Sequence, residues 1–333
     1  MSKLPFEKVE REIIIKKPAE TDDKYGTYPD KRSTEELINF GIVNIDKPQG
    51  PTSHQVSEYV QRILKIKKSG HSGTLDPNVT GILPVALKKA TRVVQILLPA
   101  GKEYICLMHL HKPVEKKQLL KVLKEFTGKI KQLPPIKSAV KRQERYRSVY
   151  YLEIIEIDKK NQDVLFRVGC QAGTYIRKLT HDIGQKLETG AHMAELRRTK
   201  AGPFNESTAV TLQDLADAFA YYKNDNIEKP IRKFIQPIEN ALEHIPKIWV
   251  FDTTVDSLAH GADLSIPGIA KLESGIEPDQ KIAILTLKGE LVGFGESLLT
   301  SKKIKDQDKG KAVKIKKVFM DPGVYPKFNL KKE

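Results

Sequence analysis

The spacing of apolar and polar residues changes several times along the chain, which indicates mixed α and β structure. In residues 53–65 apolar side chains recur about every 3.6 positions, the period of an amphipathic helix. Residues 102–111 instead alternate between apolar and polar side chains, which predicts a strand with Tyr104 on its apolar face. Between these two segments, residues 70–81 are rich in glycine and predict a shaped loop.

The same patterns extend the prediction to most of the chain. Further strands are expected at 41–45, 149–157 and 163–171, and further helices at 87–98, 116–126 and 175–187. After residue 246 the sequence consists of short β runs separated by glycine and proline. No regular strand–helix alternation is present, so the expected fold class is α+β with mostly antiparallel sheets and a small β-barrel-like second domain.

The domain limits follow from these changes in pattern. We expect an extended arm at 1–38, a mixed domain at 39–246, a β-rich domain at 247–325 and a basic tail at 326–333. The chain of 333 residues is long enough for two such domains. No apolar run is long enough for a membrane helix or a signal peptide, and we expect a cytoplasmic protein without a membrane partner.

Positive charge is concentrated in one part of the chain. Residues 61–147 hold twenty Lys and Arg against five acidic residues, while the whole chain has a net charge of +15. Residues 248–300 are acidic, with three Lys against eight acidic residues. This concentration favours a polyanionic partner such as nucleic acid, although solvated lysine surfaces are the alternative. Two cysteines without a CxxC motif and scattered histidines give no metal signature and no disulfide framework.

The loop Gly70–Gly81 reads GHSGTLDPNVTG and is the segment that indicates chemistry. Its glycines allow backbone angles closed to other residues, and Pro77 biases Asp76 towards an extended conformation. One carboxylate is thereby presented from a shaped loop. For an isolated Asp-Pro pair, a turn or a helix cap would be the more common interpretation.

This loop and the segments before and after it in the sequence, taken together, resemble the TruB family of pseudouridine synthases. The string GIVNIDKPQGPTSHQVSEYV, the GTLDP loop, KEYICLMHLH, PPIKSAVK, GTYIRKLTHDIG and HMAELRRTKAGPF follow in the family's order. Residues 247–325 resemble a PUA RNA-binding domain, and the chain as a whole is most similar to the archaeal dyskerin branch. The resemblance covers about residues 38–325 and implies an isomerase that detaches uracil from ribose and rejoins it through carbon 5, without metal or cofactor.

The resemblance also implies roles for particular residues. Asp76 matches the catalytic carboxylate, Arg177 the arginine that pairs with it, and Tyr104 the tyrosine that stacks on the target base. Leu196 matches an apolar residue of the pocket. Without the family match, a surface helix residue, a core tyrosine and a core leucine would be the better interpretations. Whether Asp76 attacks the base or the sugar, or takes a ribose proton, stays open.

Other matched positions surround these residues. Lys47 and Pro48 match a motif that supports the catalytic loop, and His71 matches a residue that contacts RNA. The basic loop 137–147 matches a mobile thumb whose phosphate contacts would come from Lys141, Arg142, Arg145 and Arg147. In the PUA segment, Gly261 and Gly268 would let RNA approach the backbone closely.

The dyskerin resemblance implies an H/ACA ribonucleoprotein. Guide RNA would select uridines in rRNA and tRNA by base pairing, and small protein subunits would complete the particle. The alternatives are a protein-only synthase for the TΨC-loop uridine of tRNA and a non-catalytic RNA-binding scaffold. A scaffold would have no reason to keep Asp76, Tyr104 and Arg177 together.

Overall fold

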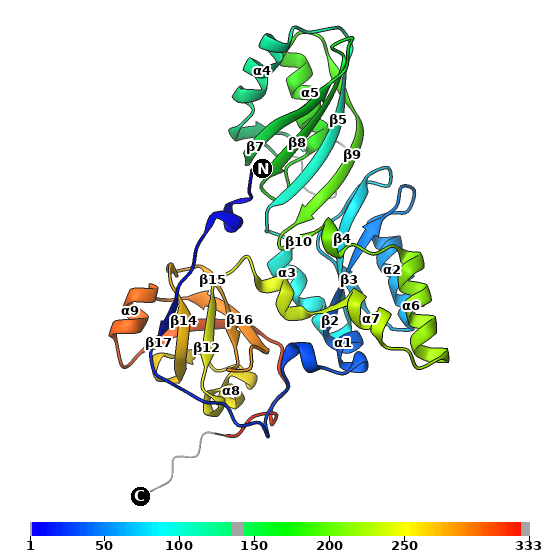
Figure 1. The fold of residues 1–333 in the computed structure, drawn as a ribbon. Coiled ribbons are helices and arrows are strands. Elements are labelled where there is room, and N and C mark those ends of the chain that lie inside the picture. Colours follow the sequence, from blue (N-terminus) through cyan, green and yellow to red (C-terminus); the bar gives the residue numbers. More distant parts are fainter. Residues whose placement is uncertain (1, 135–142, 328–333) are drawn as a thin grey trace, which may run out of the picture. The chain divides into compact units, whose positions relative to one another are not determined.

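The computed structural model describes residues 2–134 and 143–327, which form two compact units. The first unit contains residues 2–8, 43–86 and 94–234, and the second contains 9–42, 87–93 and 235–327. Figure 1 shows the elements of both units. Helices and curled sheets occur together in each unit, as an α+β fold requires.

The first unit is built on a long mixed sheet. Its path runs β2-β4-β9-β5-β8-β7-β6, with β3 paired to β4 and β10 paired to β9. The strands are β2 Gly41–Lys47, β3 Ser69–His71, β4 Thr80–Leu87, β5 Lys102–Leu110, β6 Gly128–Gln132, β7 Arg145–Ile157, β8 Asp163–Cys170, β9 Ala191–Ala201 and β10 Phe204–Asn205. The helices are η1 Pro5–Lys8, α2 Ser53–Leu64, α3 Val94–Leu97, α4 Lys116–Glu125, α5 Ile176–Lys186, η4 Glu206–Thr208, α6 Leu212–Asn224 and α7 Lys229–Phe234.

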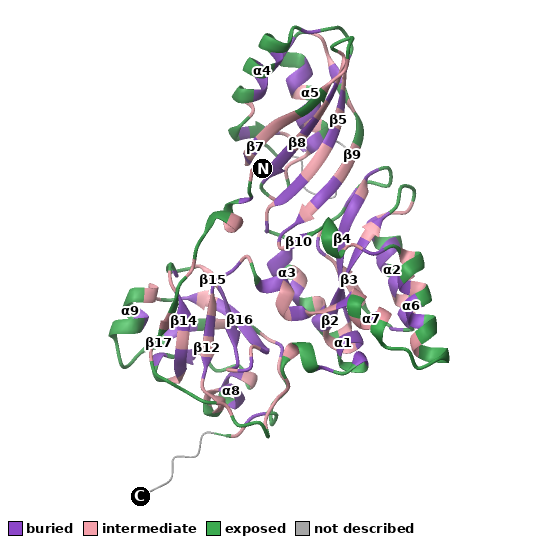
Figure 2. Ribbon diagram, viewed as in Figure 1, coloured by how far each residue is buried: buried purple, intermediate pink, exposed green. Residues whose placement is uncertain are grey.

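The core of this unit lies between the sheet and helices α4 and α5. Cys106, Met108 and Leu110 alternate along β5 and are fully buried, as the sequence pattern predicted. Leu179 and Ile183 of α5 enter the same core. In Figure 2, buried residues recur along β5 and β8. The apolar alternation therefore fixes which face of β5 meets the helices, and Tyr104 is on that face.

The second unit contains a seven-stranded sheet in the order β1-β14-β12-β15-β16-β17-β13. The seven strands of this sheet are β1 Ile13–Ile15, β12 Lys247–Val250, β13 Leu264–Ser265, β14 Ile269–Glu273, β15 Lys281–Leu285, β16 Leu291–Ser297 and β17 Lys311–Val318. The unit also contains strand β11 Ile235–Pro237, which is not part of this sheet. Its helices are η2 Pro29–Lys31, α1 Thr34–Phe40, η3 Lys88–Val93, η5 Ile238–Leu242, α8 Asp252–Ala259, η6 Ile266–Gly268 and α9 Ser301–Asp306. Strands β12 and β15 are parallel, and the other paired strands of this sheet are antiparallel.

The N-terminal segment is more ordered than the expected extended arm. Leu4 is fully buried, β1 pairs with β14, and residues 34–40 form helix α1. A capping box at the start of α1, in which Ser33 and Glu36 bond each other's backbone N–H, stabilises that helix. Arg32 donates two 2.8 Å hydrogen bonds to Glu239 in the same unit. An extended arm was expected because this segment is polar, but polar side chains such as Ser33, Glu36 and Arg32 form specific hydrogen bonds that order it.

Two other expectations need correction. The helix expected at 87–98 is a 3-10 turn, η3, followed by the short helix α3, because β4 continues to Leu87. The expected basic loop 137–147 is strand from Arg145 onward, where β7 pairs with β6. Among the described residues no helix is long and apolar enough to cross a membrane.

Candidate active site

The loop that carries Asp76 is held from beneath by a buried lysine. Lys47 has no exposed surface, and its Nζ donates to the backbone carbonyls of Pro48 at 2.8 Å, Pro77 at 3.0 Å and Val79 at 2.8 Å. Burial lowers the pKa of Lys47. All three Nζ donors are used on backbone oxygens, so the geometry suits the supporting role implied for Lys47 and Pro48.

Helix α2 braces the same loop from one side. Ser53, its first residue, is fully buried; its Oγ accepts from the Leu75 N–H at 2.8 Å and donates to the Leu75 carbonyl at 3.2 Å. Within the loop the Val79 N–H donates to the Asp76 carbonyl at 3.0 Å, closing a turn around Pro77. The Asp76 side chain remains about half exposed on this fixed backbone, where a substrate can reach it.

Arg177 approaches Asp76 from helix α5. The start of α5 is held by Gln132 of β6, which donates to the Tyr175 carbonyl at 3.1 Å and accepts from the Tyr175 N–H at 3.0 Å. Arg177, two residues later, forms an ion pair and hydrogen bond with Asp76. The two residues are 101 positions apart in the sequence, so the fold brings the implied pair together. An arginine partner keeps a carboxylate ionised and oriented.

Tyr104 and Leu196 lie on adjacent strands beside this pair. In the β5–β9 ladder, Cys106 is opposite Leu196 and Tyr104 is opposite Arg198, so these side chains share one sheet face. Tyr104 and Leu196 are partly buried and pack on the core that includes α5. Burial raises the pKa of Tyr104, so its phenol is neutral in the resting site. One apolar face therefore carries the aromatic and aliphatic residues implied for the pocket.

Arg198 is a site residue that the sequence reasoning missed. It is 1% exposed, and its Nε donates to the Ile82 carbonyl at 2.7 Å while Nη2 donates to the Gly73 carbonyl at 3.2 Å. Tyr104 lies opposite Arg198 in the β5–β9 ladder, and the nearby Tyr104 side chain raises the pKa of Arg198, which burial lowers overall. Arg198 thus connects the glycine-rich loop to Tyr104. A second arginine directly after Arg197 in a strand was the available signal, because neighbouring strand residues point to opposite faces.

His71 lies at the start of the same loop and contacts another histidine. Its ring packs edge-on against His54 of α2, with ring centroids 4.9 Å apart. Burial, with the nearby His54 and Arg198, lowers the pKa of His71 to about 4. His71 is therefore neutral at pH 7. Its Nδ1 accepts from the Gly73 N–H at 3.4 Å, which leaves the Nε2–H as the donor for RNA.

Only part of the expected thumb lies within the described residues. Lys141 and Arg142 are outside them. Arg145 and Arg147 are two positions apart on β7 and therefore lie on the same face of the strand. In the β6–β7 ladder, Arg145 is opposite Gln132 and Arg147 is opposite Ile130. Gly173 before α5 has φ +78°, and a Cβ there would lie 3.2 Å from Arg147 Nε. Arg147 thus lies against the segment that precedes α5.

The two glycines singled out in the β-rich unit differ in their surroundings. Gly261 has φ +92° and open space where a side chain would project, which suits close approach by another molecule. A Cβ on Gly268 would lie 2.6 Å from Thr254 Cγ2 of α8. Internal packing therefore already explains Gly268, while Gly261 remains available for the expected contact.

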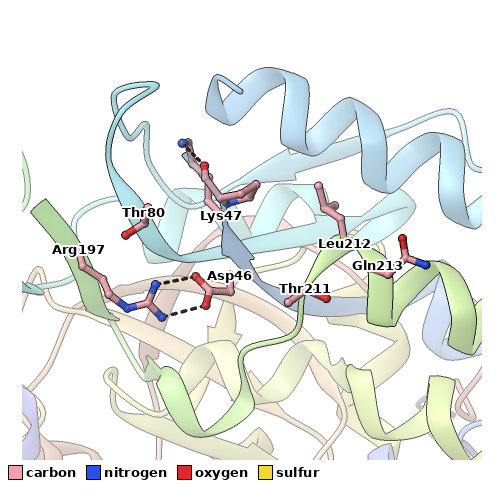
Figure 3. A pocket seen from close by; sticks show the side chains of 8 residues that line it. Asp46, Lys47, Thr80, Arg197, Thr211, Leu212 and Gln213 are labelled. Carbon is pink, nitrogen blue, oxygen red and sulfur yellow. Dashed lines mark hydrogen bonds and ion pairs between the residues drawn. The ribbon is translucent and has the colours of Figure 1, made fainter. Parts of the chain in front are cut away.

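A pocket of about 340 Å³ lies behind the supporting lysine (Figure 3). Arg197 occupies one side of it and forms two 2.9 Å hydrogen bonds with Asp46 and one of 2.7 Å with Glu206. The rest of its lining is Lys47, Pro48, Thr80, Thr211, Leu212 and Gln213. None of the three implied catalytic residues lines this pocket, so we place the candidate site at the exposed Asp76–Arg177 pair.

Comparison with known proteins shows which family this chain is similar to. Four family models match: DKCLD domain at 1–57, TruB family pseudouridylate synthase N-terminal domain at 61–176, tRNA pseudouridylate synthase B C-terminal domain at 177–243, and PUA domain at 246–319. Probable tRNA pseudouridine synthases B of Methanopyrus kandleri and Pyrococcus abyssi are 54% and 56% identical, covering 98% and 96% of this chain and 95% and 96% of theirs.

Solved structures agree with this assignment. A chain of a Cbf5–Nop10–Gar1 complex matches with TM-score 0.93 and 54% identity over 98% of both chains. A chain of an H/ACA ribonucleoprotein bound to substrate RNA containing 2′-deoxyuridine matches with TM-score 0.91 and 51% identity, covering 98% of this chain and 99% of that one. With identity above one half over nearly the whole length, this chain belongs to the TruB family and is an RNA pseudouridine synthase, an isomerase.

Proposed function

We propose that this synthase modifies uridines of rRNA and tRNA within a guide-RNA ribonucleoprotein, with Asp76 as its catalytic carboxylate. The observation that carries the proposal is the Asp76–Arg177 pair on a braced, accessible loop, beside Tyr104 on the same core face. Asp76 acts at the junction of sugar and base, and Arg177 keeps it charged and aimed. Tyr104 and Leu196 hold the flipped uracil between apolar surfaces.

Selection of the target is assigned to a guide RNA. One active site cannot read many different target sequences directly, whereas base pairing with a guide can. The similar solved chains come from an archaeal box H/ACA Nop10–Cbf5 complex, a Cbf5–Nop10–Gar1 complex and an H/ACA ribonucleoprotein with substrate RNA. We therefore propose an H/ACA guide RNA and small protein subunits of the Nop10 and Gar1 kind as partners.

Three segments of the chain are proposed to have different tasks. We propose catalysis in residues 39–246, recognition of the guide's ACA end in 247–325, and phosphate contacts from the tail at 326–333. Residues 248–300 carry net negative charge, so RNA recognition there depends on shape and base contacts near Gly261. Lys314 and Lys317 of β17 would add phosphate contacts. Two buried, free cysteines suit a reducing compartment, and we place the enzyme in the cytoplasm.

A guide-free reaction on tRNA is the second candidate. It is favoured by relatives that are described as probable tRNA pseudouridine synthases B. Both reactions would use the same site, so one enzyme could carry out both. A pure scaffold would have no use for the paired Asp76 and Arg177.

The guide requirement predicts a dependence on the ACA end. With matched guide RNA and the protein subunits present, we expect single-turnover pseudouridine formation to slow at least about tenfold when ACA is scrambled, which corresponds to about 1.4 kcal/mol. The measurement is pseudouridine formed per enzyme, with guide-free tRNA as a parallel substrate. Equal rates with both guides would refute ACA recognition, and wild-type activity on tRNA alone would favour the second candidate.

Electrostatic contacts of β7 predict a salt dependence. Replacing Arg145 and Arg147 with Gln should flatten the plot of log affinity against log salt by about 0.7–0.9 per lost phosphate contact. The matched control replaces Lys159 and Lys160, which are exposed in the turn between β7 and β8, with Gln. A slope that changes equally in both double variants would show that Arg145 and Arg147 make no particular phosphate contact.

A further inference from the structure

Three histidines meet at one end of the sheet in the first unit, although the sequence separates them. His109 is near the end of β5, His111 directly follows that strand, and His192 is the second residue of β9. In the β5–β9 ladder His109 is directly opposite His192. The ring centroids of His109 and His111 each lie 5.3 Å from that of His192. The register of the two strands therefore creates a histidine cluster that no sequence motif announces.

His111 and His192 hold two ring nitrogens at the separation of a chelating pair. His111 Nε2 and His192 Nδ1 are joined by a 3.1 Å hydrogen bond, and both side chains are exposed, so an ion can reach them. Two imidazole nitrogens bound to one ion at about 2.0–2.1 Å are about 2.9 Å apart at a right angle and about 3.3 Å apart at the tetrahedral angle. An ion can thus replace the shared proton after small rotations of the rings, and the donating ring then carries its proton on its other nitrogen.

The turn before β9 sets the position of the His111 ring. The His111 N–H donates to the Gly190 carbonyl at 3.1 Å, which ties the end of β5 to this turn. Gly190 has φ +72°, and a Cβ on it would lie 2.8 Å from His111 Nδ1. A side chain at this position would displace the ring, so glycine leaves the space that the ring occupies. The backbone therefore holds His111 beside His192.

Asp163 supplies negative charge to the same cluster. It lies opposite His109 in the β5–β8 ladder, and its Oδ1 is 2.7 Å from His109 Nδ1. A carboxylate close to a pair of imidazoles favours a cation there. Within residues 2–134 and 143–327, no group of three or more His, Cys, Asp and Glu side chains has the geometry of a metal site. The protein thus offers two ligands, and water would occupy the remaining positions around an ion.

We propose that His111 and His192 form a chelating site for a divalent late transition-metal ion such as Zn²⁺. Imidazole nitrogen suits zinc, nickel and copper ions, whereas Mg²⁺ takes oxygen ligands. His109, at the cluster, is five residues beyond Tyr104 on β5, which is about 17 Å along an extended strand. The site is therefore separate from the Asp76–Arg177 pair, and the inference does not rest on the proposed function.

Zinc binding by the full-length chain, measured by competition with a chromophoric chelator, tests this site. His111→Ala and His192→Ala should each weaken binding at least about tenfold, or about 1.4 kcal/mol, because one of two ligand bonds is lost. The double variant should bind within about threefold of either single variant, because the chelate is already broken. The matched control is His181→Ala on α5, whose side chain is 56% exposed and contacts Asp182 instead of a histidine. It should bind zinc as wild type does, and Mg²⁺ should not displace the zinc.

Covalent labelling of the wild-type chain locates the ion without any substitution. Diethyl pyrocarbonate modifies free imidazole nitrogens, and peptide mass spectrometry shows which histidines are modified. Zinc should protect His111 and His192 and leave the modification of His181 unchanged. Wild-type zinc affinity in either single variant, or equal protection of all three histidines, would overturn the proposed site. Neither experiment measures pseudouridine, so the outcome is independent of the role of Asp76.

Discussion

Replacing Asp76 with Asn abolishes pseudouridine formation while leaving RNA binding nearly intact: that is the largest effect expected of any single substitution. Asparagine keeps the volume of the side chain and removes its charge and nucleophilicity. Loss of an essential catalytic side chain costs at least about 10³-fold in turnover. RNA affinity should change by less than about tenfold, or 1.4 kcal/mol. Single-turnover product formation and a filter-binding titration measure the two quantities.

A matched control removes another carboxylate of the same sheet. Asp163 of β8 pairs with His109 at 2.7 Å, and these two residues are at the opposite end of the β5–β8 ladder from the Tyr104–Val168 pair. Asp163→Asn should keep wild-type turnover. Measurable turnover by Asp76→Asn, at wild-type stability, would mean that another group performs the reaction.

Arg177→Lys is expected to have the second largest effect. Lysine retains the positive charge and loses the planar fork that orients a carboxylate. Misplacement of the reacting carboxylate should reduce the rate about 10²-fold, the order found when one aimed hydrogen-bond donor is removed from a site. Substrate affinity should change little, because Arg177 acts on Asp76. Rates and affinities from single-turnover titrations separate the two effects.

The control for Arg177 lies at the other end of its helix. Lys186 is the last residue of α5, and its Nζ forms an ion pair with Glu125 of α4 at 3.2 Å. Lys186→Gln should leave the rate unchanged. If Arg177→Lys were as fast as wild type, charge alone would suffice and the orienting role of the fork would be wrong.

The sequence identifies the chemical groups of the site better than their arrangement. The resemblance of its glycine-rich loop to the TruB family points to Asp76, and the period of residues 53–65 predicts α2, whose first residue Ser53 then braces that loop. The link between Tyr104 and Arg198 depends on the register of β5 and β9. The adjacent Arg197 and Arg198 indicate that one of them faces the core if the segment is a strand, but periodicity within one strand does not reveal the register that places Arg198 opposite Tyr104.

The N-terminal segment shows a different limit. Its helix α1 had a local signal, the Ser33–Glu36 capping box. Strand β1 had none, because three isoleucines become a strand only through pairing with β14, more than 250 residues away. A polar segment with few apolar residues is ordered here by non-local contacts, which composition does not report.

This packing changes how the β-rich unit should be tested. Deletion of residues 248–333 would remove β14, the partner of β1, and Glu290, which accepts a 2.9 Å hydrogen bond from the Thr27 N–H. The truncated chain would then expose apolar surface of the N-terminal segment. Changes in the guide RNA, or substitutions such as Lys314→Gln and Lys317→Gln in the full chain, separate recognition from folding.

Release of tritium from carbon 5 of a labelled target uridine tests the central claim most directly. The full ribonucleoprotein, with wild-type enzyme, matched guide and protein subunits, should release label stoichiometrically in a single turnover. Release should fall sharply without the guide and disappear with Asp76→Asn. Tight binding of guide and substrate by the wild-type enzyme without tritium release, or equal release by Asp76→Asn, would contradict the account.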